Sequence, residues 1–147
     1  MSTAENKDLV RRIYEAYNEA FKKQNLAGVE ELLAPDYVWH GTGGFPDMDR
    51  AGLKQMVPAF YTALPDLHYT VEDLIAEGDK VVSRFTARAT HQGEFMGVPA
   101  TGKVVTFTGI YISRFAGGKC VEDWFSGDML GLLQQLGAIP QIAQAGA

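Results

Sequence analysis

The apolar residues of this chain change their spacing about halfway along it. In the first part, four of them recur at four-residue steps: Leu9, Ile13, Tyr17 and Phe21. That spacing indicates an amphipathic helix, and the Ser-Thr-Ala-Glu run at residues 2–5 is a capping-box pattern at its start. The second part contains β-rich runs at 67–76, 81–90, 104–115 and 120–125, with turns at 77–80 and 116–119. Helices followed by a meander of strands predict an α+β fold, with the helices gathered on one face of an antiparallel sheet.

A second helix and a short strand are predicted between residues 25 and 40. Asn25 caps this helix and Pro35 stops it. Its apolar positions are Leu26, Val29, Leu32 and Leu33. A short strand at 36–40 and a Gly-rich loop at 41–46 follow.

Asp49 opens a third predicted helix, in which Pro58 should produce a kink. A last helix follows Asp128, and residues 141–147 form a small, polar tail that we expect to fray. Since no internal repeat or linker divides the chain, residues 1–147 are predicted to form one domain.

The composition excludes several classes of protein. With 46% hydrophobic and 21% charged residues, the chain is typical of a soluble globular protein. Its net charge of −5 and lack of a basic run argue against nucleic acid as a partner. No run approaches membrane-spanning length and the N-terminus has no apolar signal core, so we expect a cytoplasmic protein that does not bind membranes. A lone cysteine, Cys120, forms no intrachain disulfide, and no metal-ligand spacing stands out.

Two segments carry a more specific pattern. Residues 91–103 read H-x-G-x-F-x-G-x-P-x-T-G-K, and residues 128–137 read D-x-L-G-L-L-x-Q-L-G. Both closely resemble segments of the SnoaL-like polyketide (ester) cyclases, and the resemblance extends over nearly the whole chain. It implies the cone-shaped fold of the NTF2-like superfamily, in which a curved sheet wraps the N-terminal helices and encloses a pocket.

The resemblance also implies a chemistry. Cyclases of this family close a ring by intramolecular aldol condensation, for which no cofactor is needed because a C–H between two carbonyls is already acidic. The enzyme must fold a hydrophobic carbonyl compound, accept one proton and stabilise an enolate. Relatives with this fold commonly pair through the outer face of the sheet, and the Val-, Ile-, Phe- and Thr-rich strands predict a homodimer here as well.

Two tyrosines are candidates for holding an enolate oxygen. The chain can be laid on ketosteroid isomerase, which shares this fold and holds its oxyanion with a tyrosine and a neutral aspartic acid. Tyr17 then falls at the oxyanion-hole tyrosine and Tyr111 at the second oxyanion donor. Gly41 falls at the aspartate base of that enzyme, so steroid isomerisation by its mechanism is not expected. The alternative is that both tyrosines only pack their rings and form local hydrogen bonds.

Other pocket residues follow from strand alternation and from relatives. Trp39 shares the face of position 41, whereas His40 points the other way unless the end of the strand kinks. Arg84 matches an arginine of limonene-epoxide-hydrolase-like members, but Thr86 replaces their aspartate, so only binding of a substrate oxygen, or pairing with a carboxylate, is expected of Arg84. The complete set predicted to contact substrate is Tyr14, Trp39, His40, Phe60, Arg84, Trp124 and Phe125.

The acid/base of the family is missing from its usual place. Aligned on the D-x-L-G-L-L segment, Phe125 occupies the position of the catalytic aspartate. Asp128 is best interpreted as the cap of the last helix, with catalysis as the alternative. Asp123 shares a predicted face with Phe125, and a desolvated aspartate there could be a relocated base; the alternative is a partner for Arg84 or for a helix end. His91 either orients the loop that it opens or takes part in catalysis.

Two hypotheses therefore remain. In the first, the chain is a cyclase-type enzyme or a related isomerase or lyase, whose catalytic set is Asp123, Tyr17, Tyr111, Asp128 and His91. In the second, it is a ligand-binding protein that keeps the pocket and has lost the reaction together with the aspartate. No metal or cofactor is expected under either hypothesis.

Overall fold

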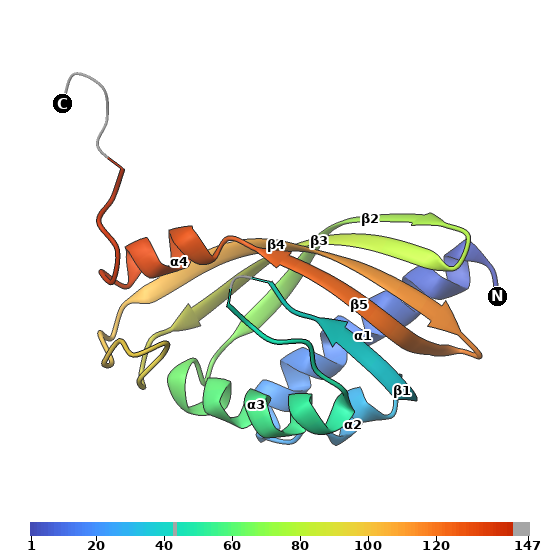
Figure 1. The fold of residues 1–147 in the computed structure, drawn as a ribbon, viewed down its shortest axis with the longest axis horizontal. Coiled ribbons are helices and arrows are strands. Elements are labelled where there is room, and N and C mark those ends of the chain that lie inside the picture. Colours follow the sequence, from blue (N-terminus) through green and yellow to red (C-terminus); the bar gives the residue numbers. More distant parts are fainter. Residues whose placement is uncertain (43, 143–147) are drawn as a thin grey trace.

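The computed structural model describes residues 1–42 and 44–142. Four helices and five strands follow one another in the order α1 (Thr3–Lys23), α2 (Ala27–Glu30), β1 (Leu33–His40), α3 (Arg50–Ala63), β2 (His68–Glu77), β3 (Lys80–Thr90), β4 (Val104–Ala116), β5 (Lys119–Gly127) and α4 (Met129–Gln135). The strands form one curved, unclosed sheet in the order β1-β5-β4-β3-β2. Figure 1 shows α1, α2 and α3 on the same side of this sheet and α4 at one end of it. The predicted α+β class and NTF2-like architecture are confirmed.

The caps of the three longer helices lie where the sequence predicted them. The Ser2 hydroxyl accepts a hydrogen bond from the Glu5 amide at the start of α1. Asp49 and Asp128 accept bonds in the same way at the starts of α3 and α4. Each side chain satisfies an amide that has no partner inside its helix, and therefore fixes where the helix begins. Pro58 lies inside α3, whereas its kink stays a prediction.

The second helix is shorter than predicted. It ends at Glu30, and Leu33 already belongs to β1, as does Pro35. Asn25 accepts a bond from the Ala27 amide but is not the N-cap residue. Apolar residues at 29, 32 and 33 fit both a helix and a buried strand end, and the pairing of Leu33 with Cys120 in β5 decides for the strand.

The sheet is not purely antiparallel, which corrects the prediction. Three neighbouring pairs, β2–β3, β3–β4 and β4–β5, are antiparallel. The fourth pair, β1–β5, is parallel, with Trp39 opposite Asp123. The long stretch between these two strands gives the chain room to return in the same direction, as a parallel pair requires. This pairing brings residues from the first third of the chain beside the last strand.

Strand alternation divides the sheet into an inner and an outer face. On β3, the buried inner positions are Val81, Ser83, Phe85, Ala87 and Ala89. The outer face carries exposed apolar side chains on three strands, β1, β2 and β4: Val38, Ile75, Val104, Ile110 and Ile112. This is the face on which the predicted homodimer would form. Among the described residues, no helix is long and apolar enough to cross a membrane.

The predicted hairpin turns are confirmed, with Gly78 and Gly118 in the left-handed region at φ of 59° and 78°. Of the predicted frayed tail, residues 141 and 142 have no regular secondary structure. Residues 143–147 lie outside the part of the chain that the structure describes.

Candidate active site

A cavity of about 110 Å³ lies between the inner face of the sheet and the helices. Apolar side chains dominate its lining: Val10, Ile13, Phe21, Phe45, Leu53, Met56, Val57, Phe60, Leu67, Phe85, Phe95, Phe107, Phe125, Met129 and Leu132. Its polar groups are few: Tyr14, Tyr17, Trp39, Tyr69, Ser83, Tyr111, Ser113 and Asp123. Among the described residues that line it, none is Lys, Arg or His. The cavity therefore suits a largely apolar compound that carries a small number of oxygen atoms.

The two predicted phenols, Tyr17 and Tyr111, both line this cavity. Within the described part of the chain, the Tyr17 hydroxyl has no hydrogen-bond partner. The Tyr111 hydroxyl accepts a bond from Trp39 Nε1 at 3.3 Å, which leaves its own proton free to be donated. Burial raises the pKa of Tyr17 and of Tyr111 well above the ordinary value, so both are neutral donors at physiological pH.

A third phenol, Tyr69, lines the same cavity and was not predicted from the sequence. Burial raises its pKa to about 12. Its ring meets that of Tyr17 edge to face, with centroids 6.2 Å apart. Tyr14, in contrast, already shares a 2.8 Å hydrogen bond with Ser83. In the sequence, only strand alternation on β2 could have placed Tyr69 in the cavity. Every second residue of that strand shares this property, so alternation does not single out Tyr69.

Asp123 lies at the polar part of the cavity and is 7% exposed. Tyr37 donates a 2.5 Å hydrogen bond to Asp123 Oδ2, and Ser113 donates to Oδ1. Burial raises the pKa of Asp123 above its ordinary value, although the bonds from Ser113, Tyr37 and Cys120 act in the opposite direction. Hydroxyl groups are thus its partners, rather than Arg84 or a helix end. A carboxyl group in this state is suited to accepting and returning a proton.

Phe125 forms the wall beside Asp123 and shares the inner face with it, as predicted. Its ring stacks on Trp39 at a centroid distance of 5.7 Å and packs against Tyr111 at 4.9 Å. A Cβ at Gly109 would come within 2.5 Å of the Phe85 ring and 3.2 Å of the Phe125 ring. The glycine therefore makes room for both rings. Phe125, which the sequence resemblance aligns with the family's catalytic aspartate, is thus one ring of an aromatic stack.

Gly41 and His91 do not contribute acid/base groups to the cavity. A Cβ at Gly41 would lie 2.1 Å from the Phe45 carbonyl oxygen, so the loop itself occupies the space that a side chain would need. His91 is fully buried and does not line the cavity. Its Nδ1 accepts a bond from the Thr101 amide and contacts the Thr101 hydroxyl at 2.9 Å. It therefore holds the 91–103 loop together, which was the alternative interpretation.

Three predicted substrate contacts lie on the outer face instead of in the cavity. Arg84 is exposed and pairs with Asp73, with Nη2 and Oδ2 2.6 Å apart. His40 and Trp124 stack on each other at a centroid distance of 5.2 Å. All three occupy outer positions of their strands because side chains alternate between the two faces. None of the three lines this cavity.

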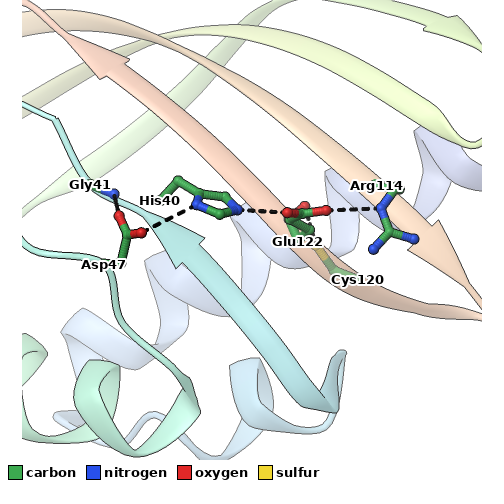
Figure 2. A network of polar contacts seen from close by, with 6 residues as sticks. All are labelled: His40, Gly41, Asp47, Arg114, Cys120 and Glu122. Atoms are coloured by element: carbon green, nitrogen blue, oxygen red, sulfur yellow. Dashed lines mark hydrogen bonds and ion pairs between the residues drawn. The ribbon is translucent and has the colours of Figure 1, made fainter.

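His40 belongs to a line of polar contacts across the outer face (Figure 2). Its Nε2 lies 2.6 Å from Glu122 Oε2, and its Nδ1 lies 3.5 Å from Asp47 Oδ2. Glu122 also accepts a 3.0 Å bond from Arg114. The bond to Glu122 raises the pKa of His40, and the pKa of Glu122 is lowered by the same bond. This network ties β1, β5 and β4 together on the side away from the cavity.

Asp128 acts as a helix cap, accepting a 2.9 Å bond from the Gly131 amide, and it does not line the cavity. Its interpretation as a capping residue is confirmed, and its alternative role in catalysis is not supported. In residues 1–42 and 44–142, no group of three or more His, Cys, Asp or Glu side chains is arranged to hold a metal ion.

Comparison with known proteins agrees with this fold. The family profile described as SnoaL-like polyketide cyclase matches residues 11–136. AclR from Streptomyces galilaeus, a candidate hydroxylase, is 35% identical with a TM-score of 0.84, over 97% of this chain and 87% of that one. IdmH from Streptomyces antibioticus, a candidate polyketide cyclase, is 36% identical with a TM-score of 0.75, over 90% and 98%. A candidate polyketide cyclase from Acidithiobacillus ferrooxidans is 29% identical with a TM-score of 0.78, over 94% and 99%. No curated protein matches the chain.

Proposed function

Because the chain belongs to the SnoaL-like polyketide cyclase family, we propose that it closes a ring in a hydrophobic carbonyl compound by intramolecular aldol condensation. The family match and the solved relatives support the broader description, a small-molecule enzyme of cyclase or hydroxylase type. The observation that carries the finer proposal is Asp123, a buried carboxyl group in an otherwise apolar cavity that also presents free phenol donors.

Three polar groups of the cavity have roles in this reaction. The Asp123 carboxylate takes a proton from the carbon next to a carbonyl group. Tyr17 and Tyr111 donate hydrogen bonds to the enolate oxygen that forms. The enolate carbon then attacks a second carbonyl carbon of the same molecule, forming the ring C–C bond, and the resulting alkoxide takes up a proton. Asp123 returns its proton, so no net proton is gained or lost by the enzyme.

The shape of the lining supports intramolecular chemistry. Aromatic rings from the β1–α3 loop, α3 and the 91–103 loop follow one another, with Phe45, Phe60 and Phe95 at centroid distances of 6.3 and 5.3 Å. Rigid aromatic walls restrict a flexible substrate to folded conformations in which its two reacting carbons are close. Holding the two carbons together in this way lowers the entropic part of the barrier to ring closure.

One observation favours a second candidate function, non-catalytic ligand binding. Phe125, which the sequence resemblance aligns with the family's catalytic aspartate, has no exchangeable proton and is held in place by stacking on Trp39. If Asp123 serves only to anchor Tyr37 and Ser113, the cavity would bind a carbonyl compound without converting it. The two functions differ in whether a bound carbonyl compound gives up a proton to the protein and takes one back.

A simple diketone distinguishes the two functions. The compound 1-phenylhexane-1,5-dione closes to 3-phenylcyclohex-2-enone with loss of water, and the conjugated product absorbs in the near ultraviolet. We expect the protein to accelerate this closure, and Asp123→Asn to abolish the acceleration, because general acid–base participation contributes about 10²–10⁴-fold. Asp128→Asn is the matched control, since this carboxyl group caps α4 outside the cavity. Equal rates for the parent and Asp123→Asn would refute the assigned base.

A further inference from the structure

The Asp123 carboxyl group is the centre of a polar cluster built by three strands. Tyr37 donates to it from β1 and Ser113 from β4. The Cys120 thiol of β5 acts to lower the pKa of Asp123, while in its own hydrogen bond it donates to the Glu122 carbonyl oxygen at 3.6 Å. In the pairing of β4 with β5, Ser113 lies directly opposite Asp123. In the parallel pairing of β1 with β5, Trp39 is opposite Asp123 and Tyr37 is two residues earlier on the same face. A tyrosine is long enough to bridge that diagonal, whereas a shorter side chain would not reach.

A bulge in β5 adds the third member. Arg114 pairs with Glu122 and the next residue, Phe115, pairs with Cys120, so one residue of β5 is left over between them. In a regular strand, side chains three positions apart point to opposite faces. The extra residue turns Cys120 to the same side as Asp123, and both side chains are buried. Bulges occur often beside active sites because they redirect a side chain in this way.

Among the residues that the structure describes, this cluster contains no cation to balance an ionised Asp123. The other titratable groups that act on Asp123, or on which it acts, are phenols and one thiol: Tyr14 and Tyr17 on α1, Tyr37 on β1, Tyr111 on β4 and Cys120 on β5. Each has a pKa raised by burial and is therefore neutral. The ionised carboxylate is stabilised by the hydrogen bonds that it accepts, while burial acts against it.

We propose that Tyr37 is a positioning residue that, together with Ser113, sets how strongly Asp123 holds a proton. The Tyr37 phenol is itself 1% exposed and does not line the cavity, so it acts on a ligand only through Asp123. The pair fixes both carboxylate oxygens, one from each neighbouring strand. It also leaves lone pairs of the same oxygens to take a proton from a ligand. As far as catalysis is concerned, this inference rests on the proposed function, but the titration of Asp123 can be measured without any reaction.

The size of the effect follows from the number of donors. A hydrogen bond to a charged group favours the charged form, and its loss raises the pKa of an acid by roughly 1–2 units. Removing the Tyr37 hydroxyl should therefore raise the midpoint at which Asp123 loses its proton by that amount. Removing the Ser113 hydroxyl should shift the midpoint in the same direction.

Infrared difference spectroscopy over a pH series tests this in the ligand-free protein. The C=O stretch of a neutral buried carboxyl group is assigned to Asp123 by its absence in Asp123→Asn. Tyr37→Phe and Ser113→Ala are expected to move the midpoint up by roughly 1–2 units each, and Ser113→Thr, which keeps a hydroxyl, should restore it. Tyr61→Phe is the matched control, since its buried hydroxyl has no partner in the described residues and is outside the cavity lining.

The outcomes separate this inference from the proposed function. An unchanged midpoint in both Tyr37→Phe and Ser113→Ala, in variants that are folded by circular dichroism, overturns the inference whether or not the protein turns over a diketone. If Tyr37→Phe does not fold, Ser113→Ala and Ser113→Thr decide. A shifted midpoint in a parent protein that closes no ring supports the inference and counts against the function alone. Where turnover is present, the pH–rate profile of Tyr37→Phe should move with the infrared midpoint.

Discussion

Tyr17 and Tyr111 differ in one contact, and that difference predicts two distinguishable phenotypes. Both residues line the cavity, but only Tyr111 accepts a bond from Trp39 Nε1. A phenolate bound in the cavity would accept a hydrogen bond from each tyrosine. A bond to a charged oxygen contributes about 1.5–3 kcal/mol, so Tyr17→Phe and Tyr111→Phe should each weaken phenolate binding by roughly 10- to 150-fold.

Stability should respond to only one of the two changes. The Tyr17 hydroxyl has no partner among the described residues, so Tyr17→Phe leaves no polar group unsatisfied. Tyr111→Phe removes the acceptor of the Trp39 indole, which is 5% exposed. An unsatisfied buried donor costs about 1–3 kcal/mol, and this loss should be seen in urea unfolding of Tyr111→Phe and not of Tyr17→Phe.

The assay uses 4-nitrophenol, whose ionised form absorbs visible light, at a pH where it is ionised in solution. Absorbance titration gives the Kd for the parent, both single variants, the double variant and Tyr61→Phe, which removes a buried hydroxyl outside the cavity lining. We expect Tyr61→Phe to bind like the parent and the double variant to bind weakest. A Kd for Tyr17→Phe equal to that of the parent would refute the argument that the two phenols form one oxyanion site.

Four further predictions concern the last strand and the outer face. Burial raises the pKa of Asp123 in the folded protein above its value in the unfolded chain. The contribution of Asp123 to stability is therefore complete below the unfolded-state pKa and is lost as the pH rises through the folded-state pKa. Thermal unfolding of Asp123→Asn over a pH series should lack this decline. Phe125→Asp should lose roughly 3–5 kcal/mol of stability through the broken aromatic stack yet gain ring closure over the parent; unchanged stability would contradict the packing. The pKa of His40 is raised by its bond to Glu122. The stability contributed by this ion pair is therefore complete below the ordinary histidine pKa and is lost as the pH rises through the raised pKa. In nuclear magnetic resonance titrations, Glu122→Gln should lower the pKa of His40. A homodimer through the outer face of the sheet should give twice the chain mass in light scattering at micromolar concentration, and a monomer mass there would count against it.

Much of the architecture could be predicted from the sequence because it depends on neighbours in the chain. The caps at Ser2, Asp49 and Asp128 are set by side chains that bond amides within three residues. The strand boundaries follow from turns at glycines with positive φ. Within one strand, alternation also placed Asp123 and Phe125 on a common face, and His40 away from it.

Tertiary structure decided which face of each strand is the inner one and which strands meet. Arg84, which was assigned to the pocket from its match to relatives, lies on the outer face between two inward-pointing residues. Trp124 likewise lies on the outer face, between Asp123 and Phe125, which point inward. The contact of Tyr37 with Asp123 spans 86 positions in sequence. It exists only because β1 lies parallel to β5 in one register, and the contribution of Cys120 depends on a bulge that breaks alternation. Caps, turns and alternation are short-range geometry and can be inferred from the order of the residues. The polar cluster arises from long-range strand pairing. The same local pattern of residues is compatible with other pairing registers, so it does not specify this cluster.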